Sequence, residues 1–425
     1  MAKTYDTYKD SGIAWIGEIP GDWEVCRYKN ICTIQSGFPF DSSKFSVQKG
    51  FPLIRIRDIT SGKIETYYDG YYPEEYVVKK GDLIIGMDGD FNVRLWQNED
   101  GLLNQRCCRL YEKKCANKSF LFYTLPMALR RINDLAYATT VKHLSNNDIY
   151  NSSITLPPLS VQQSISSFLD TKCGEIDSLI SIQEEMISEL LAYKQSVITE
   201  AVTKGLDKKA KMKNSGVEWI GDIPEEWEVI KIQYLNQGLT DGTHGTYNRV
   251  DKGRLLLSSK NVREKDLLIT DSESQISEED YQSIISNGFP KKGDLLMCCI
   301  GASIGRCIIY KYDETYAFQR SVIFIRCNKL IKPELLRYNL LSNNSLLQEL
   351  FLINQSAQAG LYQGQVKEIK VIVPPISKQK QIIDYLDKKT SQIDSLIALK
   401  LSKIESLKEY KKSIIYEYVT GKKRV

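Results

Sequence analysis

Apolar side chains recur at heptad-like spacing in two long stretches of this 425-residue chain, about 160–203 and 377–420. Such spacing predicts helices, each with one apolar stripe that needs a partner. About 42 residues at ~1.5 Å per residue give a helix of roughly 60 Å. Because each stripe matches only the other, we predict that the two helices pack antiparallel. The side chains predicted to pack between them are Ile176, Leu179, Ile180, Leu190 and Val197 in the first helix, and Ile393, Leu396, Ile397, Leu407 and Ile414 in the second.

The ends of both helices carry local signals. Pro157-Pro158 precedes the first helix, and Ser160 with Gln163 matches a capping box. The second helix has Lys380 at the box position, which predicts a weaker cap. Glycines 205 and 421 predict where the helices stop, and glycine 174 predicts a weak point inside the first.

The rest of each half has the pattern of short strands joined by turns. FPLIRIRDI at 51–59 alternates apolar and basic residues, which predicts a half-exposed strand. KKGDLIIG at 79–86 and KKGDLLMC at 291–298 each predict a turn followed by a buried strand. NQRCCRL at 104–110 matches FQRSVIF at 318–324, so the strands of the first half recur in order in the second.

The repeat extends to the start of each half. SGIAWIGEIPGDWEV at 11–25 returns as SGVEWIGDIPEEWEV at 215–229, where we expect a turn pinned by its two tryptophans. We therefore predict an α+β fold: two mixed α/β domains, separated by two long antiparallel coiled-coil helices with a pseudo-twofold internal repeat. The predicted boundaries are 1–157 and 206–374 for the two domains, and 158–205 and 375–425 for the two long helices.

Composition indicates a globular protein, with 42% hydrophobic and 26% charged residues. No apolar run reaches the ~20 residues that a membrane span requires, and the start of the chain lacks a signal-peptide pattern. We therefore expect a cytoplasmic protein without a membrane partner. Ten cysteines without a C-x-x-C pair, and two histidines, predict buried reduced thiols and no zinc site. The net charge of +4 is modest for a nucleic-acid-binding protein.

No catalytic motif is found. The chain has no P-loop and no G-x-G-x-x-G, and GASIGR at 301–306 lacks the P-loop lysine. An enzyme built from two copies should repeat its catalytic residues, and the repeated Asp82/Asp294 and Asp177/Asp394 precede a strand or lie in the long helices. We interpret these aspartates as structural, and the chain as non-catalytic.

The loops that differ between the halves carry polar residues suited to DNA. Arginine can bind the guanine edge and Asn or Gln the adenine edge, while Lys, Ser and Thr reach phosphates. The pair Gln105-Arg106 recurs as Gln319-Arg320. The predicted DNA contacts are Ser42, Ser43, Lys44, Arg55, Arg57, Gln105, Arg106, Lys142, Thr243, His244, Thr246, Lys260, Asn261, Arg306, Gln319 and Arg320.

Taken together, these segments resemble the specificity subunit of type I restriction–modification systems over essentially the whole chain. The resemblance rests on 11–25 with its repeat, LIRIRDITSGKI (53–64), DGTHGTYNR (241–249), TTVKHLSNNDIYNSSITLPPLSVQQ (139–163) and both IDSLI helices. Because His143 aligns with Gly360 of the second half, no shared histidine role is expected.

The resemblance implies that 1–157 and 206–374 are target-recognition domains, each of which reads half of a bipartite double-stranded DNA sequence. It implies that 158–205 and 375–425 are spacer helices that fix the unread spacer. It also implies two adenine methyltransferase subunits and two ATP-driven translocase–endonuclease subunits as partners. S-adenosylmethionine, ATP and magnesium would belong to those partners, and no cofactor is expected in this chain.

Two alternatives remain open from the residues alone. The chain could be a helical scaffold whose domains bind peptides or sugars, which salt-dependent binding of duplex DNA would distinguish. It could also be a self-contained methyltransferase or nuclease, which the missing motifs disfavour.

Overall fold

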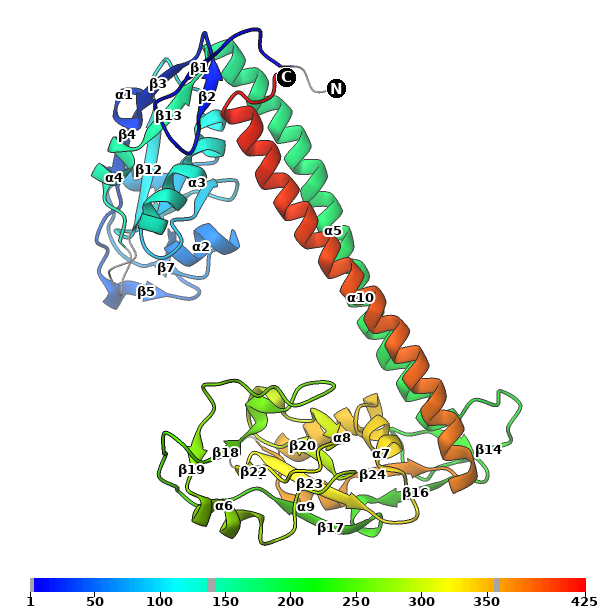
Figure 1. Cartoon of the computed structure of the whole chain (residues 1–425). Coiled ribbons are helices and arrows are strands. Elements are labelled where there is room, and N and C mark those ends of the chain that lie inside the picture. Colours follow the sequence, from blue (N-terminus) through cyan, green and yellow to red (C-terminus); the bar gives the residue numbers. More distant parts are fainter. Residues whose placement is uncertain (1–3, 136–142, 355–359) are drawn as a thin grey trace. The chain divides into compact units, whose positions relative to one another are not determined.

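The computed structural model describes residues 4–135, 143–354 and 360–425 (Figure 1). Its contacts divide the chain into two compact units. Unit 1 comprises residues 1–182 and 402–425, and unit 2 comprises residues 183–401. Both contain sheets, short helices and a segment of each of the two long helices, α5 (Leu159–Lys204) and α10 (Ile376–Val419).

Unit 1 is built on a four-stranded sheet of order β10-β9-β12-β4 and a five-stranded sheet of order β5-β7-β6-β11-β8. Two further pairs, β1-β2 and β13-β3, complete its strands. The strands are β1 (Tyr8–Asp10), β2 (Glu18–Pro20), β3 (Glu24–Arg27), β4 (Cys32–Ser36), β5 (Phe45–Ser46), β6 (Phe51–Ile54), β7 (Tyr67–Tyr68), β8 (Val77–Val78), β9 (Leu83–Gly86), β10 (Val93–Leu95), β11 (Gly101–Leu103), β12 (Cys107–Glu112) and β13 (Ser153–Leu156). Its shorter helices are α1 (Tyr28–Ile31), η1 (Ser42–Lys44), α2 (Ile56–Ser61), η2 (Glu74–Tyr76), α3 (Lys118–Leu135) and α4 (Asn146–Asn151).

Unit 2 repeats this plan, because its four-stranded sheet has the equivalent order β21-β20-β23-β17. A three-stranded sheet β19-β18-β22 and the pairs β14-β15 and β16-β24 accompany it. The strands are β14 (Met212–Asn214), β15 (Asp222–Pro224), β16 (Glu228–Lys231), β17 (Asn236–Asp241), β18 (Arg254–Leu257), β19 (Gln275–Ile276), β20 (Leu295–Cys298), β21 (Cys307–Ile309), β22 (Ala317–Phe318), β23 (Val322–Cys327) and β24 (Lys370–Val373). Its shorter helices are η3 (Ile232–Tyr234), η4 (Ser259–Asn261), α6 (Glu278–Ile285), η5 (Gly301–Ser303), α7 (Pro333–Leu340), α8 (Asn343–Asn354) and α9 (Gln363–Glu368).

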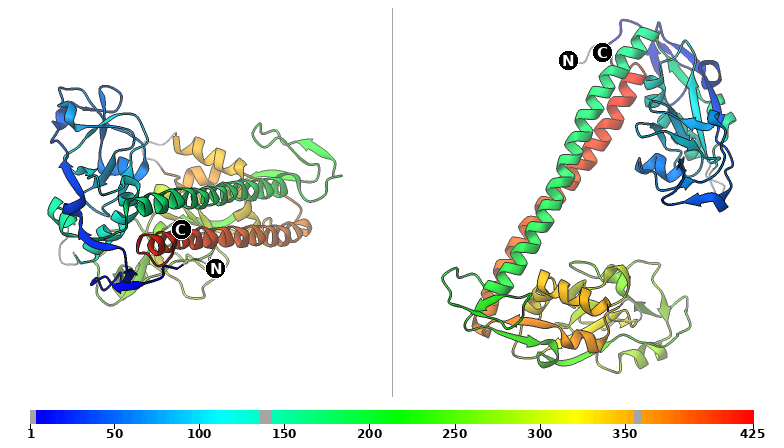
Figure 2. Two further views of the ribbon diagram at one scale, coloured as in Figure 1. Left: turned by 90° about the horizontal axis from the view of Figure 1, so that it is seen from above. Right: turned by 180° about the vertical axis from the view of Figure 1, so that it is seen from behind.

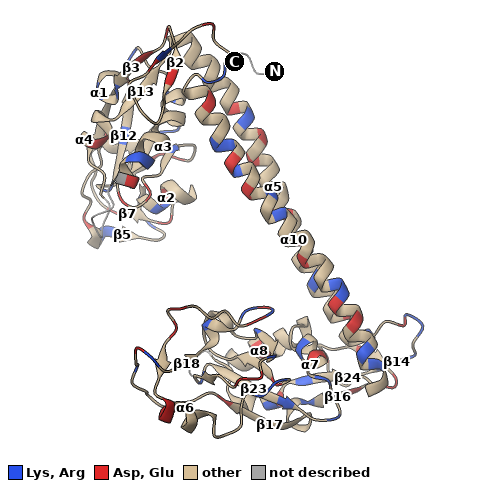
Figure 3. Cartoon of the chain, viewed as in Figure 1, with Lys and Arg blue, Asp and Glu red and all other residues tan. Residues whose placement is uncertain are grey.

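The two long helices are antiparallel in each unit and lie side by side (Figure 2). In unit 1, Lys411 Nζ lies 2.6 Å from Asp177 Oδ1, and in unit 2 Lys194 Nζ lies 2.6 Å from Asp394 Oδ1. The two ion pairs are equivalent by the repeat, which confirms a structural role for Asp177 and Asp394. Figure 3 shows residues of both charges along both helices.

The apolar side chains that pack between α5 and α10, here called the helix seam, recur every three or four residues. Ile176 and Val197 on α5, and Ile393, Leu407 and Ile414 on α10, are buried as predicted. Ile180, Leu190 and Ile397 are half-buried. The prediction was wrong for Leu179 and Leu396, which are 47% and 48% exposed. Each precedes a seam residue, and one residue turns the side chain by about 100° around the helix.

The capping-box prediction was wrong, because α5 begins at Leu159 and α10 at Ile376, which places both serines inside the helices. The neighbouring glutamines tie each helix to its unit instead. Gln162 Oε1 accepts from Asn117 N at 2.8 Å, and its Nε2 donates to the Cys115 and Pro157 carbonyls. Gln379 repeats all three bonds with Lys332, Leu330 and Pro374.

The glycine signals had mixed outcomes. Gly205 and Gly421 adopt φ values of 75° and 73° just after the helices, as predicted for helix stops. Gly174 does not interrupt α5. Of the repeated tryptophans, Trp23 and Trp227 are buried and pack near these stop glycines, whereas Trp219 is exposed. Trp15 is half-buried and packs against the core of unit 1. The expectation is therefore confirmed for Trp15, Trp23 and Trp227 and wrong for Trp219.

The strands predicted after the Lys-Lys-Gly turns are present and buried as β9 and β20. The strand predicted over 51–59 is only half correct, because β6 ends at Ile54 and α2 follows. The buried Asp58 carboxylate accepts from Arg55 N at 2.8 Å and starts this helix. Asn261 does the same for Ser258 N at 2.9 Å in unit 2. A local side-chain cap thus overrides the alternating pattern.

Candidate nucleic-acid interface

Three loops of unit 1 meet where the strands β4, β6 and β11 end. Gly37 N donates to the Cys107 carbonyl and Phe38 N to the Leu103 carbonyl, both at 2.9 Å. Asn104 N donates to the Ile54 carbonyl at 3.3 Å. A Cβ on Gly37 would lie 2.0 Å from the Asn104 carbonyl oxygen, so only glycine allows this close approach.

Unit 2 builds the same junction from the ends of β17, β18 and β22. Gly242 N donates to Val322 O at 3.0 Å, and Thr243 N to Phe318 O at 2.8 Å. Gln319 N donates to Leu257 O at 2.8 Å. A Cβ on Gly242 would lie 2.3 Å from Gln319 O. The two halves therefore share one backbone framework and present different side chains on it.

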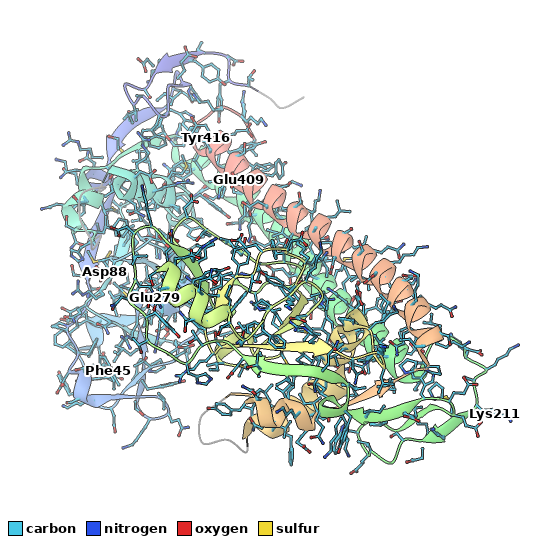
Figure 4. The ribbon with its side chains drawn as sticks, turned by 60° about the horizontal axis from the view of Figure 1, so that its bottom comes forward. Phe45, Asp88, Lys211, Glu279, Glu409 and Tyr416 are labelled. Atoms are coloured by element: carbon cyan, nitrogen blue, oxygen red, sulfur yellow. The ribbon has the colours of Figure 1, made fainter. Side chains whose placement is uncertain are left out.

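In unit 1 this junction forms an open cavity of about 510 Å³ that brings five of the predicted contacts together. They are Ser42, Arg55, Arg57, Gln105 and Arg106. Sequence reasoning missed the aromatic walls Phe40 and Phe45; the latter is labelled in Figure 4. The Arg55 guanidinium lies 5.9 Å from the centre of the Phe45 ring. Phenylalanines flanking the serine-rich loop were the available signal, since aromatic rings often accompany cations in nucleic-acid sites.

The cations of the junction differ in their partners. Arg57 Nε lies 3.5 Å from Glu65, and Lys260 Nζ lies 2.8 Å from Glu273. The Lys260 hydrogen bond lowers the pKa of the Glu273 carboxyl below its usual value. Within the described part of the chain, half-buried Arg55 has no carboxylate partner in an ion pair. Arg106, the third arginine of the cavity, lies 3.4 Å from Asp88. Of the arginines that line this cavity, Arg55 is therefore the most available to an anion.

Two aspartates, neither predicted, organise the remaining polar residues. Asp88, which is labelled in Figure 4, is one of them. It lies 2.6 Å from His143 Nδ1 and 3.4 Å from Arg106. In unit 2, Asp241 lies 2.8 Å from His244 Nε2 and accepts from Gln363 at 2.6 Å.

The histidines are not equivalent by the repeat. The bridge of Asp88 with His143 corresponds to that of Ile300 with Gly360, as the sequence alignment implied. A shared histidine role is therefore not supported.

Three predicted assignments need correction. Asn261 is 1% exposed, and its side chain bonds the Ser258 and Leu268 backbone, so it cannot reach DNA. Arg306 donates to the Val262 carbonyl and lines cavities that contain none of the other predicted contacts. The match of Gln105-Arg106 with Gln319-Arg320 is one residue out of register. The backbone hydrogen bonds of Asn104 in unit 1 are the same as those of Gln319 in unit 2, so Gln105 is equivalent to Arg320.

The other predicted contacts have varied surroundings. Lys44, Thr246 and Arg320 are exposed. Ser43 bonds Asp41, and Thr243 bonds the Tyr247 hydroxyl at 2.7 Å. Lys142 lies outside the described residues.

Among residues 4–135, 143–354 and 360–425, no cluster of His, Cys, Asp or Glu could hold a metal ion. All ten cysteines are free thiols, and burial raises the pKa of Cys108 to about 12. Cys115 is exposed, so the prediction of buried thiols was wrong there. No described helix has the length and apolarity to cross a membrane.

Comparison with known proteins identifies the family. The model of the type I restriction modification DNA specificity domain matches residues 20–191 and 222–407, one match in each repeat. The chain belongs to this family. It is 32% identical over 395 residues to the type I restriction enzyme EcoBI specificity subunit of Escherichia coli, covering 89% of this chain and 81% of that one. It is 26% identical to the MjaVIII specificity subunit of Methanocaldococcus jannaschii, covering 96% and 94% of the two chains.

A solved structure from work on complex assembly and conformational transition of the type I R-M system has the same fold. It aligns with a TM-score of 0.69 at 16% identity and covers 94% of this chain and 98% of its own. Membership in the specificity family confirms the resemblance, the α+β fold with its internal repeat, and a non-catalytic function in DNA recognition. The scaffold alternative is not supported.

Proposed function

We propose that each half of the chain reads one part of a bipartite double-stranded DNA sequence with the loops at its candidate interface. The observation that carries this proposal is the repeated backbone framework with divergent side chains. A framework that is constant while its exposed side chains vary is suited to reading different base sequences. The boundaries 1–157, 158–205, 206–374 and 375–425 are retained as the proposed functional divisions.

The contacts proposed for unit 1 are the five predicted residues that line its cavity, together with three others. They are Ser42, Arg55, Arg57, Gln105 and Arg106, and Ser43, Lys44 and Lys142. In unit 2 they are Thr243, His244, Thr246, Lys260, Gln319 and Arg320. The basic side chains would neutralise phosphates, and the amides and Arg320 would reach base edges.

The partners of the proposal are two methyltransferase and two restriction–translocase subunits. S-adenosylmethionine, ATP and magnesium would be bound by those subunits, and the complex would act in the cytoplasm. We propose that apolar side chains exposed on the long helices form part of the methyltransferase docking surface. In unit 1 these are Leu179, Ile182 and Tyr410, and in unit 2 Met186, Leu191, Tyr193, Leu396, Leu399 and Leu401.

The test is methylation by the purified complex of this chain with its methyltransferase. We expect methylated adenines only within one bipartite sequence, and binding to duplex DNA that weakens steeply with salt. Methylation without any bipartite preference would overturn the proposal. Methyltransferase activity of the isolated chain with S-adenosylmethionine would contradict its non-catalytic assignment.

A further inference from the structure

Gln105 and Arg320 occupy the same position in the two halves, although the sequence suggests a different match. Asn104 bridges Phe38, and Gln319 bridges Thr243 in the same parallel arrangement. Cys107 N bonds Asn104 O at 2.8 Å, and Val322 N bonds Gln319 O at 3.2 Å. The residue that follows each bridge is therefore Gln105 in unit 1 and Arg320 in unit 2.

The backbone at this position is held firmly in both units. In both units a hydrogen bond across the turn closes it. The glycine of the adjacent loop, Gly37 or Gly242, packs directly on the first carbonyl of the turn. Arg320 N also donates to Thr243 O at 3.0 Å. The Cα atom of a residue on such a turn has a fixed position. Direct reading of a base edge by the side chain requires such a fixed position.

Both side chains are exposed and available. Within the residues that the structure describes, neither side chain has a hydrogen-bond or ion-pair partner. Gln105 also lines the cavity with Arg55 and Ser42, so it lies among the other candidate contacts of unit 1. By contrast, Arg57 and Lys260 at another equivalent position are both paired with glutamates.

We propose that this turn position is a base-reading position in both halves, with Gln105 reading an adenine and Arg320 a guanine in the major groove. A glutamine amide can donate to adenine N7 and accept from its N6 amino group. An arginine guanidinium can donate to guanine N7 and O6. The inference rests on the proposed function and adds which residue distinguishes the two parts of the DNA sequence.

The test is exchange of the two side chains in the complex with the methyltransferase, read by mapping methylated adenines across a genome. Gln105→Arg should change one base pair of the part read by unit 1 from A·T to G·C and leave the other part unchanged. Arg320→Gln should make the reverse change in the part read by unit 2. Each preference should be roughly 5- to 150-fold, the range for one bidentate contact.

Gln97→Arg is the matched control, since Gln97 is exposed in the same unit and does not line the cavity. It adds the same charge and should leave the sequence preference unchanged. If Gln105→Arg abolishes methylation, Gln105→Ala provides the decisive measurement with a set of single-base-pair variants of the DNA. Loss of discrimination at one A·T pair supports the proposal, and unchanged discrimination at every pair overturns it. A wild-type complex without bipartite preference would instead refute the proposed function.

Discussion

Glu349 is a buried carboxyl residue in unit 2, beside a turn whose sequence differs between the two units. It is 3% exposed, and its Oε1 has no hydrogen-bond partner. Its other oxygen lies 2.5 Å from the Cβ that a side chain at Gly305 would add. The backbone hydrogen bonds of β9 in unit 1 and of β20 in unit 2 show that Phe91 is equivalent to Gly305 by the repeat. Phe91 is buried. Unit 2 thus has a buried carboxyl beside the turn of Gly305, whereas the equivalent turn of unit 1 contains Phe91.

Burial raises the pKa of Glu349 to about 8 from 4.5, so the folded protein binds this proton more tightly than the unfolded chain. Its contribution to stability is fully present below pH 4.5 and is lost as pH rises through about 8. Relative to wild type, Glu349→Gln should therefore become more stable as pH rises from 5 to 8, by on the order of 1 kcal/mol per pH unit. Thermal unfolding at pH 5 and pH 8 measures this difference. Exposed Glu226→Gln is the control, and an equal effect of both variants would contradict the assignment.

A second residue-scale prediction compares two arginines of one cavity. Arg55→Ala should weaken DNA binding more than Arg57→Ala, because Arg57 is already paired with Glu65. If Arg55 contacts a phosphate, its loss should also reduce the salt dependence of binding by about one ion. Fluorescence anisotropy with the methyltransferase complex at several salt concentrations tests both expectations. Equal losses for the two variants would refute the distinction.

At the scale of elements, the buried glutamines near the starts of α5 and α10 secure each long helix to the sheets of its unit. Each satisfies one backbone N–H and two backbone carbonyls. A second repeated bond joins α3 or α7 to the same helices, since Tyr123 donates to Asp170 and Tyr338 to Asp387. The orientation of each domain on its helix therefore depends on polar contacts as well as on apolar packing.

We predict that Gln162→Ala and Gln379→Ala each destabilise the protein by about 1–3 kcal/mol, because buried backbone groups lose their partners. Urea unfolding followed by circular dichroism measures the free energy of unfolding. Gln163→Ala, at an exposed position next to Gln162, is the matched control and should have little effect. A capping role for Gln163 would give the opposite order.

At the scale of the whole molecule, the numbers of residues in α5 and α10 are proposed to set the spacer between the two parts of the DNA sequence. Removing 181–187 and 398–404 deletes equivalent residues from both helices. It also retains the ion pairs of Asp177 with Lys411 and Lys194 with Asp394. Both deletions together shorten the helices by about 10 Å, which corresponds to up to roughly three base pairs.

The double deletion should therefore give methylated sites with a shorter spacer and unchanged flanking parts. Deleting 181–187 alone should instead disrupt the helix pairing and lower stability. An unchanged spacer in the double deletion would remove the role of helix length. Mapping methylated adenines in cells that carry each variant provides the measurement.

The sequence by itself determined the internal repeat, the long helices and the buried strands, because these follow from periodic apolar positions over many residues. It also located most of the polar loops at the interface. Only the tertiary structure decided the register of the turn with Gln105 and Arg320, since one residue of shift is set by backbone bonds to a distant loop. It likewise showed that Asn261 is a buried cap and that Gln162 anchors a helix. Short polar side chains serve caps, anchors and surfaces alike, and only their neighbours in space distinguish these roles.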